Sequence, residues 1–245
     1  MFPLLGYEAS HNIIVKILNN LYIQIIFFEI KLNMFINNLP DKIAVFPLSN
    51  AVFFPKTILP LNIFEKRYIQ LVDDCMKDHR LFGMIQPKSK QRGGSEVYEV
   101  GCLGKITSFN ETQDKRYLIG LTGMIRFRID RELNTKKLYR EFKVDYSDFS
   151  NDLSDKNSDK QNSEIRNILE KIKIYFERKN YMIQFDELKK LNCDQLISTI
   201  SMIASFSPEE KQKIIETIKI EDKIKVFEKI LSFSILDKSK NKTIQ

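Results

Sequence analysis

Residues 46–68 read FPLSNAVFFPKTILPLNIFEKRY, and this stretch decides how the chain begins to fold. Three prolines, Pro47, Pro55 and Pro60, interrupt its short apolar runs. Proline removes a backbone donor and fixes φ, which restricts it to strand ends, edge strands and turns. The runs IAVFPL, AVFF and TILPL are therefore predicted to be short extended pieces separated by sharp bends.

A helix is predicted over residues 62–78, directly after the third run. Asn62 followed by Glu65 is a variant of the capping box, which predicts that the helix begins at Asn62. The apolar residues that recur there at helical spacing are Ile63, Phe64, Tyr68, Leu71, Val72, Cys75 and Met76.

Proline-broken strands that lead into one capped helix resemble the opening of the Lon N-terminal domain family, the substrate-binding region of ATP-dependent Lon proteases. The family pattern is roughly FPL, a variable stretch, then LFPG, LPL and IFExRY. This chain has FPL at 46–48, FFP at 53–55, LPL at 59–61 and IFEKRY at 63–68. It departs from the pattern at Lys56, where the family usually has glycine.

Further motifs follow in the order that the family has them. LFGMI at 81–85 matches the strand after the first helix, and VGCLGKI at 100–106 matches the family's VGxxGxI strand. RYLIGLTGMIRF at 116–127 matches the RYxIxLxGxxRF hairpin, and FSPEEKQ at 206–212 matches the helical half. The resemblance covers about residues 40–237, nearly all of the predicted globular region.

The resemblance implies both a fold and a function. The fold is α+β, with a PUA-like bent β barrel or sandwich that carries one helix, followed by a helical bundle. The function is that of a non-catalytic domain that binds unfolded or tagged polypeptides in the cytoplasm, in proteolysis or protein quality control. A separate Lon-type protease is a further partner that the resemblance suggests.

The residues between 81 and 149 are predicted to be mostly strand, with loose alternation in 98–107 and 139–146 and a polar turn at 111–115. Residues 117–129 read as two strands kinked at Gly120 and Gly123, where a missing side chain permits a bulge or a close backbone approach. Short strands with glycine kinks favour a strongly bent sheet or an open barrel.

The strand at 124–130 is predicted to have one core face and one basic face. The residues expected to point inward are Ile125, Phe127 and Ile129. The residues expected to point outward are Arg126, Arg128 and Asp130.

Residues 147–163 are rich in Ser, Asn, Asp and Lys and predict a polar linker. Amphipathic helices follow, one of them opened by a capping box at Ser207 with proline at its first position. Each has a single apolar face, so all must pack together or on the barrel. The predicted division is an extension at 1–39, a β subdomain at 40–150, a linker at 151–163, a helical subdomain at 164–237 and a tail at 238–245.

The N-terminal extension contains the most apolar stretch, IIVKILNNLYIQIIFFEI at 13–30. Polar residues interrupt it every few positions, which disfavours a membrane span, and the basic start and cleavage site of a signal peptide are missing. We expect translation to start at Met34, just before the family-like region. A membrane-surface helix is the alternative.

The composition excludes several kinds of site. The cysteines, Cys75, Cys102 and Cys193, are far apart and odd in number, and His11 and His79 are isolated, so neither a disulfide framework nor a metal site is expected. The cysteines are interpreted as buried thiols in a reducing compartment. The net charge of +7 comes from scattered lysines. It is interpreted as solvated surface, with an acidic or nucleic-acid partner as the alternative.

No catalytic or cofactor-binding residues are predicted. The sequence lacks the G-x-x-x-x-G-K-[ST] pattern that cradles phosphates, and no serine or cysteine stands in a recognisable nucleophile–base context. Asp73 and Asp74 are adjacent on the predicted helix and point to different sides, so they are interpreted as solvated surface. We expect a stand-alone recognition domain without the ATPase and peptidase of Lon proteases.

Polypeptide binding is predicted to use exposed apolar surface near the bends. The candidate residues are Phe53, Phe54, Pro55 and Pro87, with the loop at 87–95. The alternative for Phe53 and Phe54 is burial in the core. Glu65, Arg67 and Arg126 are expected to pair internally and to hold the helix on the barrel.

RNA binding is the alternative function, since PUA-like folds often bind RNA. The basic residues that would serve it are Arg126, Arg128, Arg131, Lys136 and Lys137. Asp130, Glu132 and Asp145 are interleaved with them, and Tyr117 and Phe127 are the only aromatic candidates for base stacking nearby, so nucleic acid is the less favoured partner.

Overall fold

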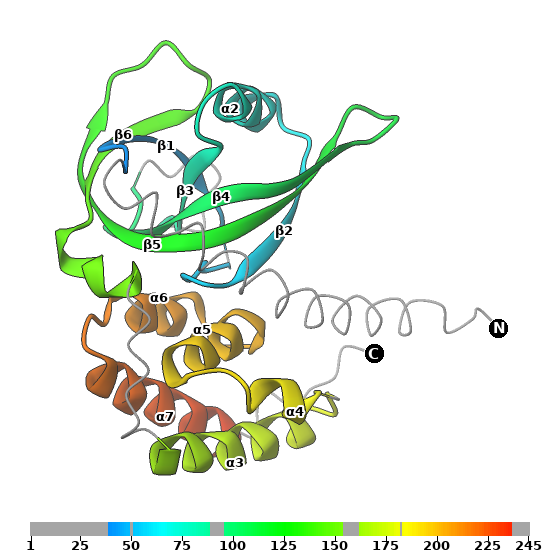
Figure 1. The fold of residues 1–245 in the computed structure, drawn as a ribbon, viewed down its shortest axis with the longest axis vertical. Coiled ribbons are helices and arrows are strands. Elements are labelled where there is room, and N and C mark those ends of the chain that lie inside the picture. The colour runs from blue at the N-terminus through cyan, green and yellow to red at the C-terminus, as the bar shows by residue number, and fades with distance from the viewer. Residues whose placement is uncertain (1–38, 50, 89–95, 154–161, 182, 237–245) are drawn as a thin grey trace.

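The computed structural model describes residues 39–49, 51–88, 96–153, 162–181 and 183–236, and it shows a β barrel packed on a group of helices (Figure 1). The strands are β1 (Lys42–Pro47), β2 (Ile58–Ile63), β3 (Leu81–Ile85), β4 (Val100–Glu111), β5 (Tyr117–Leu133) and β6 (Arg140–Asp145). The helices are α2 (Lys66–Met76), the 3-10 helix η2 (Ser147–Leu153), α3 (Asn162–Arg178), α4 (Phe185–Leu188), α5 (Cys193–Ile203), α6 (Pro208–Glu216) and α7 (Ile220–Leu236). The predicted start at Met34 lies outside the described residues.

The strands form one mixed sheet that closes on itself. Their order is β2-β5-β4-β3-β1-β6, and β5 also pairs with β6. Strand β5 serves both ends of this sheet, because residues 117–122 pair with β2 and residues 128–133 pair with β6. The barrel is therefore as predicted, but residues 117–133 form one continuous strand instead of two.

The interior of the barrel is built around Phe127, which is fully buried. A Cβ atom on Gly101 would lie 2.6 Å from Phe127 Cζ and 2.4 Å from the carbonyl oxygen of Met84. Real Cβ atoms do not approach so closely, so this position needs glycine for the ring to fit. The predicted inward orientation of Phe127 is confirmed.

Strand β2 lies at the edge of the sheet, since within the described ranges β5 is the only strand that pairs with it. Pro60 stands opposite Gly120 in that pairing, and an edge strand tolerates a residue without an N–H. A Cβ on Gly123 would lie 2.1 Å from the carbonyl oxygen of Phe54, which confirms the close backbone approach expected at Gly123. Residues 51–54, the AVFF run, lie in a loop and join no strand.

Helix α2 covers the end of the barrel opposite the other helices (Figure 1). It begins at Lys66 after Glu65, whose side chain makes no capping hydrogen bond. The predicted start at Asn62 is wrong because Asn62 pairs with Leu118 in the β2–β5 ladder. The residues that α2 buries are Tyr68, Leu71, Val72 and Cys75.

Asp73 and Asp74, which were predicted to be solvated surface, form hydrogen bonds that attach α2 to the barrel. Asp73 accepts a hydrogen bond from the Tyr117 hydroxyl at 3.0 Å. Asp74 accepts from Lys137 Nζ at 2.6 Å and from the Tyr139 hydroxyl at 2.9 Å. Because adjacent helical residues point to different sides, the two carboxylates contact two different parts of the chain.

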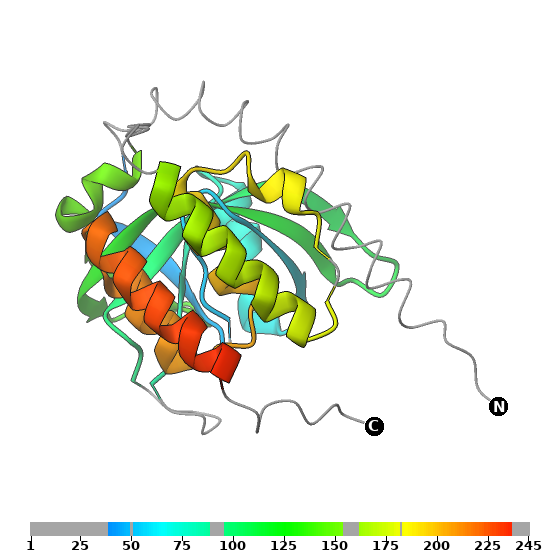
Figure 2. The ribbon, with the colours of Figure 1, turned by 90° about the horizontal axis from the view of Figure 1, so that it is seen from below.

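The remaining helices pack under the barrel, with α3 and α7 side by side across the far face (Figure 2). Lys171 on α3 pairs with Glu228 on α7 at 2.8 Å. The capping box at Ser207 is confirmed, and Asn192 forms a second one at the start of α5. The predicted linker is wrong in its first part, because residues 147–153 form η2 and bury Phe149.

Candidate functional site

The predicted peptide-binding residues Phe53, Phe54 and Pro55 are all buried, with Phe53 2% and Phe54 0% exposed. The Thr57 hydroxyl donates to the Phe54 carbonyl at 2.6 Å and fixes the loop that carries them. The core alternative is therefore confirmed for Phe53 and Phe54, and these side chains offer no exposed surface. Pro87 is partly exposed and bridges to Val97, while residues 89–95 of its loop lie outside the described residues.

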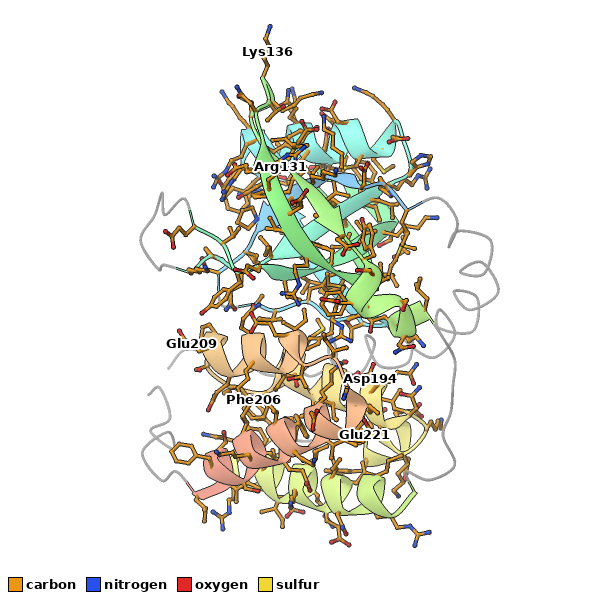
Figure 3. The ribbon with its side chains drawn as sticks, turned by 90° about the vertical axis from the view of Figure 1, so that its left-hand side faces the viewer. Arg131, Lys136, Asp194, Phe206, Glu209 and Glu221 are labelled. Atoms are coloured by element: carbon orange, nitrogen blue, oxygen red, sulfur yellow. The ribbon has the colours of Figure 1, made fainter. Side chains whose placement is uncertain are left out.

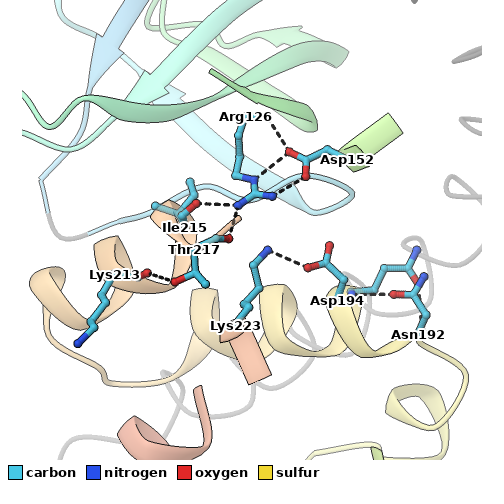
Figure 4. A network of polar contacts seen from close by, with 9 residues as sticks. Arg126, Asp152, Asn192, Asp194, Lys213, Ile215, Thr217 and Lys223 are labelled. Atoms are coloured by element: carbon cyan, nitrogen blue, oxygen red, sulfur yellow. Dashed lines mark hydrogen bonds and ion pairs between the residues drawn. The ribbon is translucent and has the colours of Figure 1, made fainter. Parts of the chain in front are cut away.

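The basic residues predicted for RNA binding do not form one exposed patch. Arg131 and Lys136 lie toward the α2 end of the barrel (Figure 3), while Arg126 is buried at the other end, against the helices (Figure 4). Arg128 pairs with Asp148 at 3.0 Å, and Lys137 pairs with Asp74 at 2.6 Å. Carboxylates thus neutralise much of this charge.

Arg126 is 2% exposed, although its side chain points out of the barrel as the alternation predicts. The helical part of the chain covers it. Its guanidinium forms a two-pronged ion pair with Asp152 of η2, with Nε–Oδ2 at 2.9 Å and Nη2–Oδ1 at 2.7 Å. Nη1 donates to the carbonyls of Ile215 at 2.9 Å and Thr217 at 2.7 Å, at the end of α6. The predicted outward direction of Arg126 is therefore correct, but the prediction that this face is exposed is wrong at Arg126.

The charge of Arg126 is retained in this buried setting. Burial alone would lower the pKa of Arg126, but the hydrogen bonds and charge of Asp152 raise it. The guanidinium carbon also lies 4.6 Å from the centre of the Phe149 ring, within range of a cation–π contact. Arg126 thus joins the barrel to η2 and α6 and does not hold α2, while Glu65 and Arg67 pair with each other on the surface.

Two glutamines and a second, half-buried ion pair extend this contact between the barrel and the helices, which we call the joint. Gln212 of α6 donates to the Val100 carbonyl at 3.1 Å, and Gln86 donates to the Pro208 carbonyl at 3.0 Å. Below Arg126, Lys223 Nζ lies 2.8 Å from Asp194 Oδ1 (Figure 4). Burial alone would raise the pKa of Asp194, but Lys223 holds it below its usual range. These contacts are structural and leave this surface covered.

An exposed apolar surface lies elsewhere, on the part of the sheet that projects beside α2 (Figure 1). We call this part the arm and define it as residues 58–64 and 106–121. Within it, β4 and β5 form a hairpin, and β2 pairs along β5. Residues 112–116 close the hairpin, with the Thr112 N–H donating to the Arg116 carbonyl at 2.9 Å.

Exposed apolar side chains occur on both faces of the arm. Side chains alternate along a strand, and residues paired across strands share a face. On the outer face, Leu118 is 42% exposed and Phe64, just past the end of β2, is 62% exposed. On the inner face, toward α2, Phe109 is 41% exposed, and its ring centre lies 4.9 Å from that of Tyr117.

Charged groups surround these apolar residues. The Arg116 guanidinium lies 5.8 Å from the centre of the Phe64 ring and pairs with Asp114 at 2.7 Å. Burial and the hydrogen bond to Asp73 raise the pKa of Tyr117, so its hydroxyl remains a donor at neutral pH. The arm therefore combines exposed rings, half-buried Leu61 and exposed charged side chains, which suits contact with an extended chain.

The sequence did not identify the arm because its apolar residues come from three separate strands. The sequence places Phe64 within the helix predicted over 62–78, but α2 starts at Lys66 and Phe64 precedes it. Phe109 and Leu118 are brought onto neighbouring positions by the pairing of Phe109 with Ile119 and of Asn110 with Leu118. Phe109 is an isolated apolar residue in the polar run TSFNE at 107–111, but the face on which it lies follows only from the register of β4 against β5.

The described residues show no other candidate for chemistry. They contain no group of three or more His, Cys, Asp or Glu side chains that could hold a metal ion. Cys75, Cys102 and Cys193 are buried and free, and burial raises the pKa of Cys75 to about 12. None of the helices in the described ranges is long and apolar enough to cross a membrane.

Comparison with known proteins identifies relatives. Residues 42–232 match the ATP-dependent protease La (LON) substrate-binding domain family. The Lon protease of Desulfosudis oleivorans is 29% identical over 206 residues, which cover 80% of this chain and 24% of that protein. The Lon protease of Dictyoglomus thermophilum is 22% identical over 196 residues, which cover 76% of this chain and 24% of that protein. The chain thus spans about a quarter of the length of these relatives.

Two solved structures share the fold. The N-terminal domain of Mycobacterium avium complex Lon protease superposes with a TM-score of 0.60 at 12% identity, covering 78% of this chain and 98% of that one. The Lon N-terminal domain protein from Xanthomonas campestris gives a TM-score of 0.55 at 19% identity, with the same coverage. Both agree with the α+β fold predicted from the sequence. On the match over residues 42–232, the chain belongs to the family of Lon substrate-binding domains.

Proposed function

We propose that this chain is a non-catalytic recognition domain that binds unfolded or tagged polypeptides in the cytoplasm. Its role would be to support proteolysis or protein quality control, with a Lon-type protease as a partner. Membership of a substrate-binding domain family supports this function. The observation that carries it is the arm, a projecting part of the sheet that exposes Phe64 and Leu118 on one face and Phe109 on the other.

The proposed binding is weak and driven by burial of apolar surface. Ordering an extended chain on a small surface offsets much of the gain from burial. We therefore expect micromolar or weaker affinity for an unfolded peptide, about −8 kcal/mol or less favourable. Because the main contribution is apolar, raising the salt concentration should change the affinity for an uncharged peptide little, whereas nucleic-acid binding would weaken steeply.

Fluorescence anisotropy tests this proposal with a labelled uncharged unfolded peptide and a labelled RNA, each at two salt concentrations. The variant Phe64→Ser/Phe109→Ser/Leu118→Ser should bind the peptide at least about tenfold more weakly, since burial of one large apolar side chain is worth about 1.5–3 kcal/mol. Ile174→Ser is the matched control, because Ile174 is 43% exposed on α3, outside the arm.

Two outcomes would contradict the proposal. Peptide binding that the arm variant leaves unchanged would move the site away from the arm. Tight, salt-sensitive RNA binding without peptide binding would favour the nucleic-acid alternative. The same protein is expected to hydrolyse neither ATP nor casein, because the sequence contains no P-loop and no nucleophile–base arrangement.

A further inference from the structure

Strand β2 uses one backbone edge to pair with β5 and leaves its other edge open. In an antiparallel pair, residues alternate between those whose N–H and C=O point toward the partner strand and those whose groups point away. The Gly123 N–H donates to the Thr57 carbonyl at 2.8 Å, so Thr57 points toward β5. Leu59, Leu61 and Ile63 follow at alternate positions and continue this side of the ladder.

The hairpin on the other side of β5 gives the same phase. The Thr112 N–H donates to the Arg116 carbonyl at 2.9 Å, so Arg116 points toward β4. By alternation the next residue, Tyr117, points toward β2, where it stands opposite Ile63. Two independent hydrogen bonds therefore agree on which residues of β2 face β5.

The intervening residues, Ile58, Pro60 and Asn62, direct their backbone groups away from β5. Their open groups are the N–H of Ile58 and of Asn62 and the carbonyls of all three, since proline has no N–H. Within the described residues, no hydrogen bond joins these groups to another part of the chain. Pro60 and Asn62 are exposed, so this edge is accessible.

The open edge is apolar and carries no charge. Proteins commonly protect a sheet edge with charged side chains, with proline or with a covering segment. Residues 58–63 read ILPLNI and include no charged residue, and Ile58, Leu59 and Leu61 are only half-buried. Pro60 removes the middle donor, which weakens pairing at this edge but leaves the groups on either side of it available.

We infer that an extended polypeptide joins the free edge of β2 as an additional strand. Its backbone pairs with Ile58 and Asn62 and donates to the Pro60 carbonyl. Its alternate side chains cover Leu59 and Leu61 on one face of the sheet and lie beside Ile58 on the other. A row of backbone donors and acceptors at strand spacing matches another extended backbone, which favours a polypeptide over a nucleic acid.

This inference rests on the proposed function and specifies how the arm holds its polypeptide. Backbone hydrogen bonds are the same for every sequence except at proline, so this mode accepts many unfolded chains. The missing donor at Pro60 keeps the pairing incomplete, in agreement with weak and reversible binding.

Amide hydrogen exchange, resolved by residue with NMR, gives the direct test on the full chain. In the free protein, the amides of Ile58 and Asn62 should exchange faster than those of Leu59 and Leu61, which face β5. The uncharged unfolded peptide, added at about 100 times its Kd, should slow exchange at Ile58 and Asn62 by about tenfold or more.

Methylation of the peptide backbone separates strand pairing from apolar contact. Three peptides with identical uncharged side chains are compared: one unmodified, one N-methylated at alternate residues and one N-methylated at every residue. A strand presents the donors of alternate residues to each side, so the alternately methylated peptide keeps one intact edge and should bind like the unmodified one. Methylation at every residue should weaken binding by about tenfold or more, because it removes all donors.

Pro60→Ala restores the missing donor on the protein side. It should tighten peptide binding by roughly two- to tenfold, the effect of one added hydrogen bond. Damage to the fold can weaken binding but does not tighten it, so this result is specific. Pro208→Ala is the matched control, because Pro208 lies at the start of α6 and outside the arm, and it should leave the affinity unchanged.

The failures are distinguishable. Peptide binding that tolerates complete N-methylation and leaves exchange at Ile58 and Asn62 unchanged would overturn the inference while the proposed function stands. Slow exchange at both amides in the free protein that is lost on dilution would show that a second copy of the chain occupies the edge, and would also overturn it. If the full chain binds none of the peptides, both the proposed function and the inference fail.

Discussion

Lys56 occupies a backbone conformation that suits glycine better. Its φ is 58°, in the left-handed region, and its N–H donates to the Gly123 carbonyl at 2.9 Å. The conformation is therefore fixed by the contact between the loop and β5. This explains why the resembling family usually has glycine here, since a Cβ atom makes the left-handed region unfavourable.

Replacement of Lys56 should measure the cost of its left-handed backbone conformation. We expect Lys56→Gly to be more stable than Lys56→Ala by about 1–2 kcal/mol, because only the alanine variant keeps a Cβ in the left-handed region. Both variants remove the same ammonium group, so their difference reports the backbone alone. Chemical denaturation measures it, and equal unfolding free energies would show that the loop relaxes without cost.

Phe127 is expected to be among the most costly core residues to truncate. Phe127→Ala should lower the unfolding free energy by about 3–5 kcal/mol, since the ring is fully buried and leaves a cavity in the barrel. Phe109→Ala is the control, because that ring is 41% exposed on the arm. A denaturation midpoint that Phe127→Ala leaves unchanged would contradict the burial of the ring.

At the scale of elements, charged contacts add to the buried apolar face that attaches α2 to the barrel. The hydrogen bond from Lys137 lowers the pKa of Asp74, and the Tyr139 hydroxyl lowers it further. A carboxyl whose pKa is lower in the folded state than in the unfolded state stabilises the protein at pH values above the ordinary pKa of the carboxyl, which is 3.8 for Asp74. That contribution is lost as the pH falls through the folded-state pKa.

Asp74→Asn tests this pH dependence. At neutral pH the variant should be less stable than the parent protein, and the difference should vanish as the solution is acidified below pH 3.8. Unfolding free energies measured across this range check the expectation. Asp222→Asn, at an exposed position on α7, is a control. A difference between the two proteins that stays constant with pH would exclude titration of Asp74 as the cause.

The elements that the sequence predicted well are those with local signals. LFGMI at 81–85 forms β3, and the Ser207 box opens α6, because each is decided by neighbouring residues. The helix start predicted at Asn62 is wrong because a distant residue decides its structure: Asn62 pairs with Leu118 in the sheet. The arm could not be predicted because the register of three strands decides which of its residues are neighbours. In addition, the alternation of a sequence does not show whether another part of the chain covers a face.

At the scale of the whole molecule, the barrel and the helices are joined through a buried polar contact. Alternation correctly placed Arg126 on the outside of the barrel but could not show the covering layer. Its partner Asp152 is 26 residues away in a segment whose composition suggested a linker, and the Thr217 carbonyl is 91 residues away. Such a contact depends on tertiary structure alone.

The joint should be sensitive to the loss of either charge. Arg126→Met is expected to lower the unfolding free energy by about 3–5 kcal/mol, because it leaves the Asp152 carboxylate buried without its partner. Adding Asp152→Leu to that variant should recover part of the loss, which a double-mutant cycle measures. A loss below about 1 kcal/mol in Arg126→Met would show that the ion pair does not hold the joint.

Strand β5 is a continuous covalent link between the arm and the residue that joins the barrel to the helices. It runs without interruption from Tyr117 in the arm to Leu133, and it carries Arg126 on the way. A polypeptide held at the arm and pulled from its other end would load this strand along its axis. The tension would pass through covalent bonds to Arg126 and from there through its hydrogen bonds into η2 and α6, so β5 would carry such a load from the arm to the helices.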